Sequence, residues 1–186
     1  MGKYNLSKLL IKCADDGSIC VSDIKLKPIN DNDIEIMRQW RNKENITNNI
    51  FIDNRIISEE DQIRWYKRYK INKYDEMFII KINEISVGTV ALYNIDYKSG
   101  SAEFGRLLIG DINNRGKNIA LIATKAICYY GFNGLSLNRI NLKVYKNNIK
   151  AINLYKKVGF TEIKEVDIEN EDIIVMEIYK NTIKYN

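Results

Sequence analysis

The chain has 186 residues, of which 45% are hydrophobic and 28% charged, a composition that predicts one globular domain and excludes a disordered chain. Its net charge is +5 with both signs interspersed, which favours an anionic partner without requiring one. The chain contains no histidine, which excludes Ser-His and Cys-His nucleophilic catalysis, metalloproteases with an H-E-x-x-H motif and every zinc site that needs an imidazole.

Residues 1–22 are expected to form an extension that precedes the main domain, residues 23–182. Cys13, Cys20 and Cys128 are an odd number of cysteines without C-x-x-C spacing, so reduced thiols in a cytoplasmic protein are the simplest interpretation. The apolar stretch near the N-terminus is too short and too charged for a signal peptide, and no window is long enough for a transmembrane helix. We therefore expect a cytoplasmic protein that does not bind membranes.

The main domain is predicted to begin with one strand and two helices. Apolar and polar residues alternate over residues 23–29, which predicts a strand. Asn30 and Asp31 are favourable helix caps, and apolar residues follow at helical spacing to about residue 42. Ser58 precedes three acidic residues and opens a second helix, because carboxylates suit the positive end of the helix dipole.

The order of the later elements indicates the fold class. Strands at 77–82, 85–95 and 102–109 are predicted to form an antiparallel meander. The elements expected after it are a polar loop at 113–118, a helix at 119–132, a strand at 139–145, a helix at 148–158, and strands at 160–166 and 172–179. This order predicts a mixed α/β (α+β) domain around one sheet.

The segment FGRLLIGDINNRGKNIA combines a buried-type strand with a polar loop that opens a helix. Free amide groups at a helix start, together with the helix dipole, suit a phosphate or pyrophosphate. Arg115 and Lys117 add positive charge at the same point. A solvated turn would carry the same residues, so this pattern alone leaves both interpretations open.

Four stretches together resemble the GNAT superfamily of acyl-CoA-dependent N-acetyltransferases. The family's pyrophosphate loop reads Q/R-x-x-G-x-G/A, which residues 115–120 match except that Asn118 replaces the inner glycine. Asparagine tolerates the left-handed backbone region better than most residues. The stretches NIKAINLY and VGF resemble the family's N-x-x-A-x-x-x-Y helix and the strand start that follows it, and SAEF resembles its central strand. The similarity runs from about Ile24 to Tyr179 and implies a mostly antiparallel central sheet flanked by helices, with two splayed parallel strands.

The resemblance implies acetyl-CoA as co-substrate, with no metal. The strand at 107–109 would splay from the strand at 140–145 and offer its peptide groups to the pantetheine arm. Asn148 would hydrogen-bond that arm, although a helix N-cap is an equally good reason for an asparagine there. The implied cofactor-binding residues are Leu107, Leu108, Ile109, Arg115, Gly116, Lys117, Asn118, Ile119, Ala120, Asn148 and Tyr155.

Two residues are candidates for moving protons. Tyr155 lies seven residues after Asn148 and so on the same helix face; in the family, a tyrosine at this position protonates the departing CoA thiolate, and the alternative is a core tyrosine. Glu103 is the candidate general base, because the amine must lose a proton and no histidine can take it. Strand alternation places Glu103 on one face with Gly105 and Leu107, where it points either into a cleft or to solvent.

The first two helices resemble the branch of the family that acetylates amino groups on nucleotide-activated sugars. The implied acceptor-binding residues are Arg38, Trp40, Arg41, Asn42 and Trp65, with Phe51 between the helices. Aromatic rings can stack on a base or sugar and arginines can bind a diphosphate, or the aromatic residues simply form the helix core. The expected reaction is direct attack of a primary amine on the thioester in a ternary complex, by a monomer or homodimer.

Three alternatives to the amino-sugar acceptor stay open. The central strand and the C-terminal half also resemble spermidine and ribosomal-protein N-terminal acetyltransferases. A non-catalytic acyl-CoA-binding domain is compatible with Asn118 in the loop. A nucleic-acid-binding domain is less favoured, because the basic residues are spread evenly and no aromatic-basic motif accompanies them.

Overall fold

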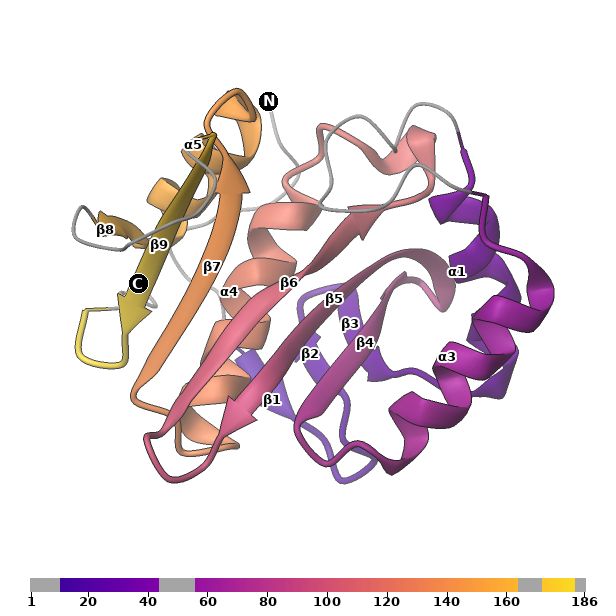
Figure 1. Cartoon of the computed structure of the whole chain (residues 1–186), viewed down its shortest axis with the longest axis horizontal. Helices are drawn as coiled ribbons and strands as arrows, with labels where there is room; N and C mark the ends of the chain where they lie inside the picture. The colour runs from indigo at the N-terminus through magenta and orange to yellow at the C-terminus, as the bar shows by residue number, and fades with distance from the viewer. Residues whose placement is uncertain (1–10, 44–55, 164–171, 183–186) are drawn as a thin grey trace.

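The computed structural model describes residues 11–43, 56–163 and 172–182. These residues form one sheet in the order β1-β2-β3-β4-β5-β6-β7-β9-β8 (Figure 1). The strands are β1 (Ile11–Cys13), β2 (Ile19–Val21), β3 (Ile24–Pro28), β4 (Asp75–Ile82), β5 (Ile85–Asp96), β6 (Ser101–Ile109), β7 (Arg139–Tyr145), β8 (Thr161–Ile163) and β9 (Ile173–Tyr179). The helices are α1 (Ile34–Arg41), α3 (Glu59–Ile71), α4 (Ile119–Asn133) and α5 (Ile149–Val158), with short 3-10 turns η1 (Asp31–Asp33) and η2 (Ile112–Asn114). The mixed, mostly antiparallel sheet flanked by helices is confirmed.

The N-terminal hairpin of β1 and β2 is part of this sheet. Val21 pairs with Ile24 of β3, and Ile19 and Val21 are buried. The expected boundary at residue 22 therefore divides a continuous sheet, while residues 1–10 lie outside the described residues. Each of the two strands has only three residues, too few for apolar alternation to predict a strand.

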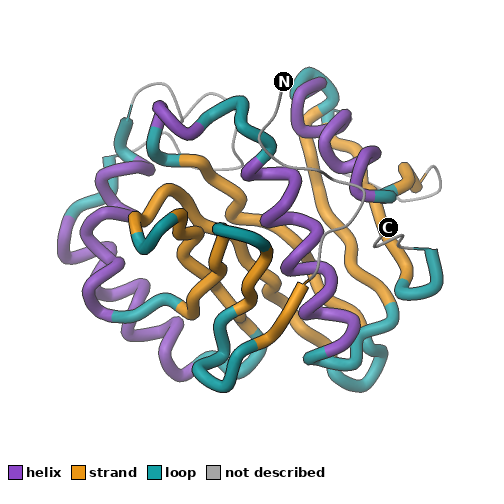
Figure 2. The backbone as a smooth tube through the Cα atoms, turned by 180° about the vertical axis from the view of Figure 1, so that it is seen from behind, coloured by secondary structure: helices purple, strands orange, loops and turns teal. Residues whose placement is uncertain are grey.

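Both faces of the central strands are covered by helices (Figures 1 and 2). Along β4, Phe78 faces the cluster under α4, whereas its neighbour Ile79 faces the smaller cluster under α1 and α3. Side chains of a strand alternate between faces, so a strand buried on both faces is apolar without interruption. The run from Met77 to Ile80 is such a strand.

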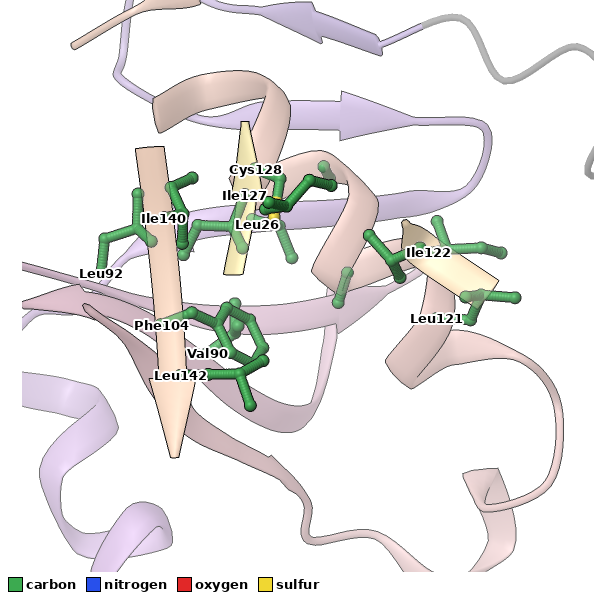
Figure 3. Close-up of a cluster of buried hydrophobic side chains, with 14 of the residues drawn as sticks. Leu26, Val90, Leu92, Phe104, Leu121, Ile122, Ile127, Cys128, Ile140 and Leu142 are labelled. Atoms are coloured by element: carbon green, nitrogen blue, oxygen red, sulfur yellow. The ribbon is translucent and has the colours of Figure 1, made fainter. Parts of the chain in front are cut away.

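Helix α4 is the centre of the larger core (Figure 3). Ile122, Ile127 and Cys128 on this helix are fully buried, as is Leu26 of the sheet beneath it. The buried hydroxyl of Thr124 donates to the Ala120 carbonyl oxygen at 2.7 Å, which satisfies it inside the helix. Within the described ranges, no helix combines the length and the apolar character needed to cross a bilayer.

The central parallel strands β6 and β7 pair at one end only. Their register covers Ser101–Glu103 against Arg139–Asn141, and the strands diverge beyond it (Figure 1). This divergence is the splay implied by the family resemblance. It leaves the second half of β6 without a partner on that side among the described residues.

A bulge in β6 changes which side chains share a face. The β5–β6 register shifts between Thr89 and Ala91, Arg106 has φ 51°, and the Thr89 hydroxyl donates to the Arg106 carbonyl oxygen at 2.8 Å. Leu107 consequently packs with the α4 cluster, whereas Tyr93, the partner of Glu103, belongs to the α1/α3 cluster. The expectation that Leu107 shares a face with Glu103 is therefore wrong, because one inserted residue reverses the alternation.

Candidate active site

A cavity of about 1060 Å³ opens where β6 and β7 diverge, at the upper end of the size expected for a ligand pocket. Residues of α1, α3, β5, β6, β7, α5 and the start of α4 line it. The structure brings together in its wall these predicted residues: Arg41, Trp65, Glu103, Leu107, Leu108, Ile109, Arg115, Gly116, Asn118, Ile119, Ala120, Asn148 and Tyr155. Residues from six separate predicted elements thus converge on one space.

Two of the predicted residues are buried or engaged elsewhere. Trp40 is 4% exposed and belongs to the α1/α3 core cluster, where a Cβ at Gly110 would overlap its indole. Lys117 is exposed and its Nζ lies 3.3 Å from Asn114 Oδ1. Neither residue is part of the cavity wall. For Trp40 the open alternative, a core role, is what the structure shows.

Arg38 and Asn42 also lie outside the cavity wall. Both side chains form hydrogen bonds to the backbone of Ile57, which precedes α3. Arg38 donates to both carboxylate oxygens of Glu35, at 2.8 and 2.7 Å, and to the Ile57 carbonyl oxygen. The Asn42 side chain exchanges two hydrogen bonds of 2.9 Å with the backbone of Ile57. Phe51 lies outside the described residues.

The start of α4 forms one end of the cavity. Asn118 precedes the helix with φ 61° and ψ 8°, which confirms that asparagine adopts the left-handed conformation here, and its side chain does not cap the helix. Gly116 also has a positive φ, 75°. Arg115 Nε donates to the Ile109 carbonyl oxygen at 3.1 Å, which fixes this side chain beside the loop. The first amide groups of a helix have no partner within it, so this end can bind an anionic group.

Helix α5 presents Asn148 and Tyr155 to the same cavity. Asn148 is the N-cap of α5, and its Oδ1 accepts from the Ala151 amide at 3.2 Å. The Tyr155 ring packs edge-on against Phe104 and Phe160, at centroid distances of 5.6 and 5.9 Å. Burial raises the pKa of Tyr155 to about 12, so its hydroxyl is a proton donor at neutral pH.

Glu103 lies in the wall where the parallel pairing of β6 and β7 ends. Its Oε1 accepts from the Tyr93 hydroxyl at 2.8 Å, and its Oε2 accepts from Asn94 Nδ2 at 3.2 Å. Both donors come from β5, the antiparallel neighbour. Tyr93 also lines the cavity, and no sequence signal pointed to it beyond its place in a predicted strand.

Arg106 and Asp75 form an ion pair that no sequence pattern predicted. Arg106 Nη1 and Nη2 donate to the two carboxylate oxygens of Asp75 at 2.6 and 2.8 Å, and the Asp75 side chain is only 7% exposed. The guanidinium lies 4.7 Å from the Tyr93 ring centroid and 6.0 Å from that of Trp65. A charged residue inside the apolar run FGRLLI was the available signal, but the bulge that directs its side chain is not visible in the sequence.

Arg41 lines the cavity from the end of α1. Its Nε is buried and has no hydrogen-bond partner among the described residues. Burial, and then the proximity of Arg106, lower the pKa of Arg41. An arginine so placed is a donor held ready for an anionic ligand. No group of side chains suited to holding a metal occurs in the described ranges.

Comparison with known proteins agrees with this geometry. Residues 23–161 match the family described as Acetyltransferase (GNAT) domain. The chain is 32% identical over 141 residues to Acetyltransferase PseH of Campylobacter jejuni, an alignment that covers 74% of this chain and 85% of the relative. It is 26% identical over 163 residues to the spermidine N(1)-acetyltransferase of Escherichia coli, covering 87% and 83%. The crystal structure of Vibrio cholerae spermidine N-acetyltransferase in complex with CoA and spermine superposes with a TM-score of 0.77 at 26% identity, covering 87% of this chain and 98% of that one.

Proposed function

Since this chain belongs to the acetyltransferase (GNAT) domain family and is an N-acetyltransferase, we propose that it transfers an acetyl group from acetyl-CoA to the primary amine of a nucleotide-activated amino sugar. One observation carries the choice of acceptor, the charge of the cavity wall. Among the described residues, the cations that line it are Arg41, Arg106, Arg115, Lys143, Lys150 and Lys157, and the one carboxylate is Glu103. Arg115 lies at the start of α4, the three lysines lie on β7 and α5, and Asp75 pairs with Arg106. Between α1, α3 and β6 this leaves Arg41, whose buried Nε has no partner among the described residues and favours an anionic acceptor over a polyamine.

The cofactor end has the donor set that a pyrophosphate requires. The start of α4, the left-handed turn at Asn118 and Arg115 all line the cavity. Backbone amide groups at a helix start and a guanidinium can both bind a pyrophosphate. From Leu107 to Ile109, β6 pairs with β5 but not with β7, so its peptide groups on the β7 side can bind the pantetheine arm, and Asn148 can bind the same arm. When bound, acetyl-CoA supplies the thioester carbonyl that the amine attacks.

Glu103 and Tyr155 have complementary roles in this proposal. Glu103 takes a proton from the acceptor amine as nitrogen attacks the carbonyl carbon in a ternary complex. Tyr155 gives its proton to the sulfur as the carbon–sulfur bond breaks. Burial raises the pKa of Tyr155, and the same apolar surroundings raise that of a departing thiol, which keeps the two groups matched for transfer.

The acceptor occupies the end of the cavity between α1, α3 and β6. Arg41 binds its diphosphate, since the Arg41 Nε has no partner among the described residues. Trp65 lines the same end and is only partly buried, so its indole can stack on a base or sugar. Arg106, whose charge is neutralised by Asp75, lies in the same part of the wall, close to both Arg41 and Trp65.

The experiment that tests this function is a screen of acceptors with CoA release as the readout. Acetyl-CoA should first raise the melting temperature of the chain, because a ligand that binds only the folded state stabilises it. A UDP-linked amino sugar, spermidine and a peptide with an N-terminal alanine are then compared. We expect CoA release with the sugar nucleotide and little with spermidine.

Chromatographic detection of CoA suits this screen, because the exposed thiol of Cys13 would react with thiol reagents. The Glu103→Gln variant is the matched control for uncatalysed transfer. Release with spermidine alone would overturn the sugar acceptor, and absence of thermal stabilisation by millimolar acetyl-CoA would overturn the donor. Salt-sensitive binding to random DNA would instead favour a nucleic-acid-binding domain.

A further inference from the structure

Tyr93 and Glu103 form a cross-strand pair in the cavity wall. They lie opposite each other in the β5–β6 register, and the Tyr93 hydroxyl donates to Glu103 Oε1 at 2.8 Å. Asn94 Nδ2 donates to Oε2 at 3.2 Å, so both carboxylate oxygens accept a hydrogen bond from β5. Each oxygen keeps a second lone pair, which leaves room for a proton from a substrate.

The Tyr93 ring is itself held from two directions. The Arg106 guanidinium lies over the ring, 4.7 Å from its centroid, and Asp75 fixes that guanidinium through two hydrogen bonds. Next to the ring edge lies Gly105, where an added Cβ would be 2.9 Å from Tyr93 Cε1 and Oη. Glycine at 105 therefore makes the space in which the hydroxyl reaches Glu103.

From this arrangement we propose that Tyr93 is a positioning residue, which orients the Glu103 carboxylate toward the acceptor amine while that amine is deprotonated. The inference rests on the proposed role of Glu103 as general base and holds for any amine acceptor. A donor to an ionised carboxylate stabilises the ionised form and fixes the direction of its free lone pairs. Gly105, Arg106 and Asp75 serve the same end by fixing the ring.

No proton leaves Tyr93 in this scheme. The amine proton goes to a free lone pair of Glu103, which becomes neutral, while the Tyr93 hydroxyl keeps its own proton and remains a donor throughout. Burial, the hydrogen bond to Glu103 and the charge of Glu103 all raise the pKa of Tyr93, which keeps it protonated over the working pH range. At Glu103 one proton is gained, from the amine nitrogen, and the separate proton that the sulfur receives comes from Tyr155.

The pH dependence of turnover measures how Tyr93 affects Glu103 as the general base. The charged and titratable groups that share the cavity wall with Glu103 include Arg106 on β6, Lys143 on β7, Arg41 on α1 and Tyr155 on α5, and Asp75 on β4 pairs with Arg106. None of them changes when Tyr93 is replaced by phenylalanine. The chain has no histidine, so no imidazole titrates between about pH 5 and 8 to obscure the carboxylate.

The test compares Tyr93→Phe with Tyr69→Phe as control. Tyr69 is also half-buried, but its hydroxyl bonds the Met77 backbone instead of a carboxylate. With a UDP-linked amino sugar as probe, we expect the acidic limb of kcat/KM in Tyr93→Phe to move up by about one pH unit and kcat to fall about tenfold. The KM for acetyl-CoA should not change, and the control should leave the limb in place.

Gly105→Ala is a second variant that keeps Tyr93 and crowds its ring. It should move the acidic limb in the same direction, whereas a limb unmoved in both Tyr93→Phe and Gly105→Ala would overturn the proposal. A uniform loss of kcat at every pH without any shift would indicate a merely structural role and would overturn it too.

A second readout separates this inference from the choice of acceptor. The carboxyl ¹³C spectrum of the glutamate-labelled chain, with Glu103 assigned through Glu103→Gln, needs no acceptor. The Glu103 carboxyl signal should move in Tyr93→Phe, where the hydrogen bond to Oε1 is lost, and stay in place in Tyr69→Phe; an unmoved signal in Tyr93→Phe contradicts the proposal. Absence of turnover by the wild type with the sugar nucleotide would count against the acceptor only.

Discussion

At the scale of single residues, the site depends on side chains that both pack and carry a polar group, and a single substitution can remove the polar group while the packing stays. Tyr155 packs with its ring and would act with its hydroxyl, and the ring contacts are to Phe104 and Phe160. Phenylalanine keeps those contacts and removes only the hydroxyl group. The same separation applies to Arg41, whose charge is buried whereas nothing in the fold among the described residues bonds its Nε.

Tyr155→Phe should lower kcat about a hundredfold, the lower range for loss of a general acid. The dissociation constant of acetyl-CoA should stay nearly constant, because the apolar ring still fills the cavity wall. Steady-state kinetics and calorimetry measure the two quantities. Tyr130→Phe, in a half-buried tyrosine that packs on Phe78 outside the cavity wall, is the control, and unchanged turnover in Tyr155→Phe would reject the acid role.

Arg41→Gln should raise the KM of the sugar nucleotide about tenfold or more, because a charge-assisted bond to its diphosphate is lost. The KM of acetyl-CoA should not change. Since burial and Arg106 already disfavour the Arg41 charge, the free energy of unfolding should rise. Arg64→Gln is the control, because the Arg64 side chain is exposed and its Nη1 makes only a surface ion pair, 3.6 Å from Asp61 Oδ1. Equal effects of the two substitutions would contradict a specific role for Arg41.

At the scale of elements, the β6 bulge and the turn before α4 decide how the wall is built. The bulge directs Arg106 toward Asp75 and reverses the alternation after it. Alternation of apolar and polar residues predicted the strand correctly but predicted the wrong sheet face for Leu107. The reason is that a bulge adds one residue, which a pattern with a period of two does not reveal. At Asn118 the residue type predicted the left-handed backbone conformation correctly, because few residues tolerate it.

Asn118→Ala should lower the free energy of unfolding by about 1 kcal/mol, because the left-handed backbone conformation at this position is less favourable for alanine than for asparagine. Asn118→Gly should be nearly as stable as the wild type and should keep its affinity for acetyl-CoA. Urea denaturation and calorimetry check both statements. An alanine variant as stable as the glycine variant would show that the turn relaxes to another conformation.

At the scale of the whole molecule, the distribution of titratable groups sets the pH range of the fold. Burial is the main cause that raises the pKa of Tyr69, Tyr130 and Tyr155 to about 12, above the ordinary value of about 10. A native-state pKa above the unfolded one gives stability that is complete below about pH 10 and is lost as pH rises toward 12. Without histidine, no imidazole adds a change between pH 6 and 8.

We therefore expect the free energy of unfolding to stay level from pH 6 to 8 and to fall steeply above about pH 10. Urea denaturation at stepped pH values measures the profile. Tyr130→Phe should flatten the alkaline fall, because it removes one of the buried phenols. A fall that begins near pH 7 would mean that another group governs stability.

The sequence by itself determined the order of the main elements, the turn that opens α4 and the common helix face of Asn148 and Tyr155. These depend on local spacing and on backbone preferences that each residue carries with it. It also determined that any proton transfer here must avoid imidazole.

Only the tertiary structure decided which side chains reach the cavity. Arg41 and Trp65 line it whereas Arg38, Trp40 and Asn42 do not, and Tyr93 meets Glu103 through strand pairing. The physical reason is that a helical or strand period tells which residues share a face but not what that face packs against. Strand register, the β6 bulge and the placement of α1 and α3 supply that information through contacts between residues far apart in the chain.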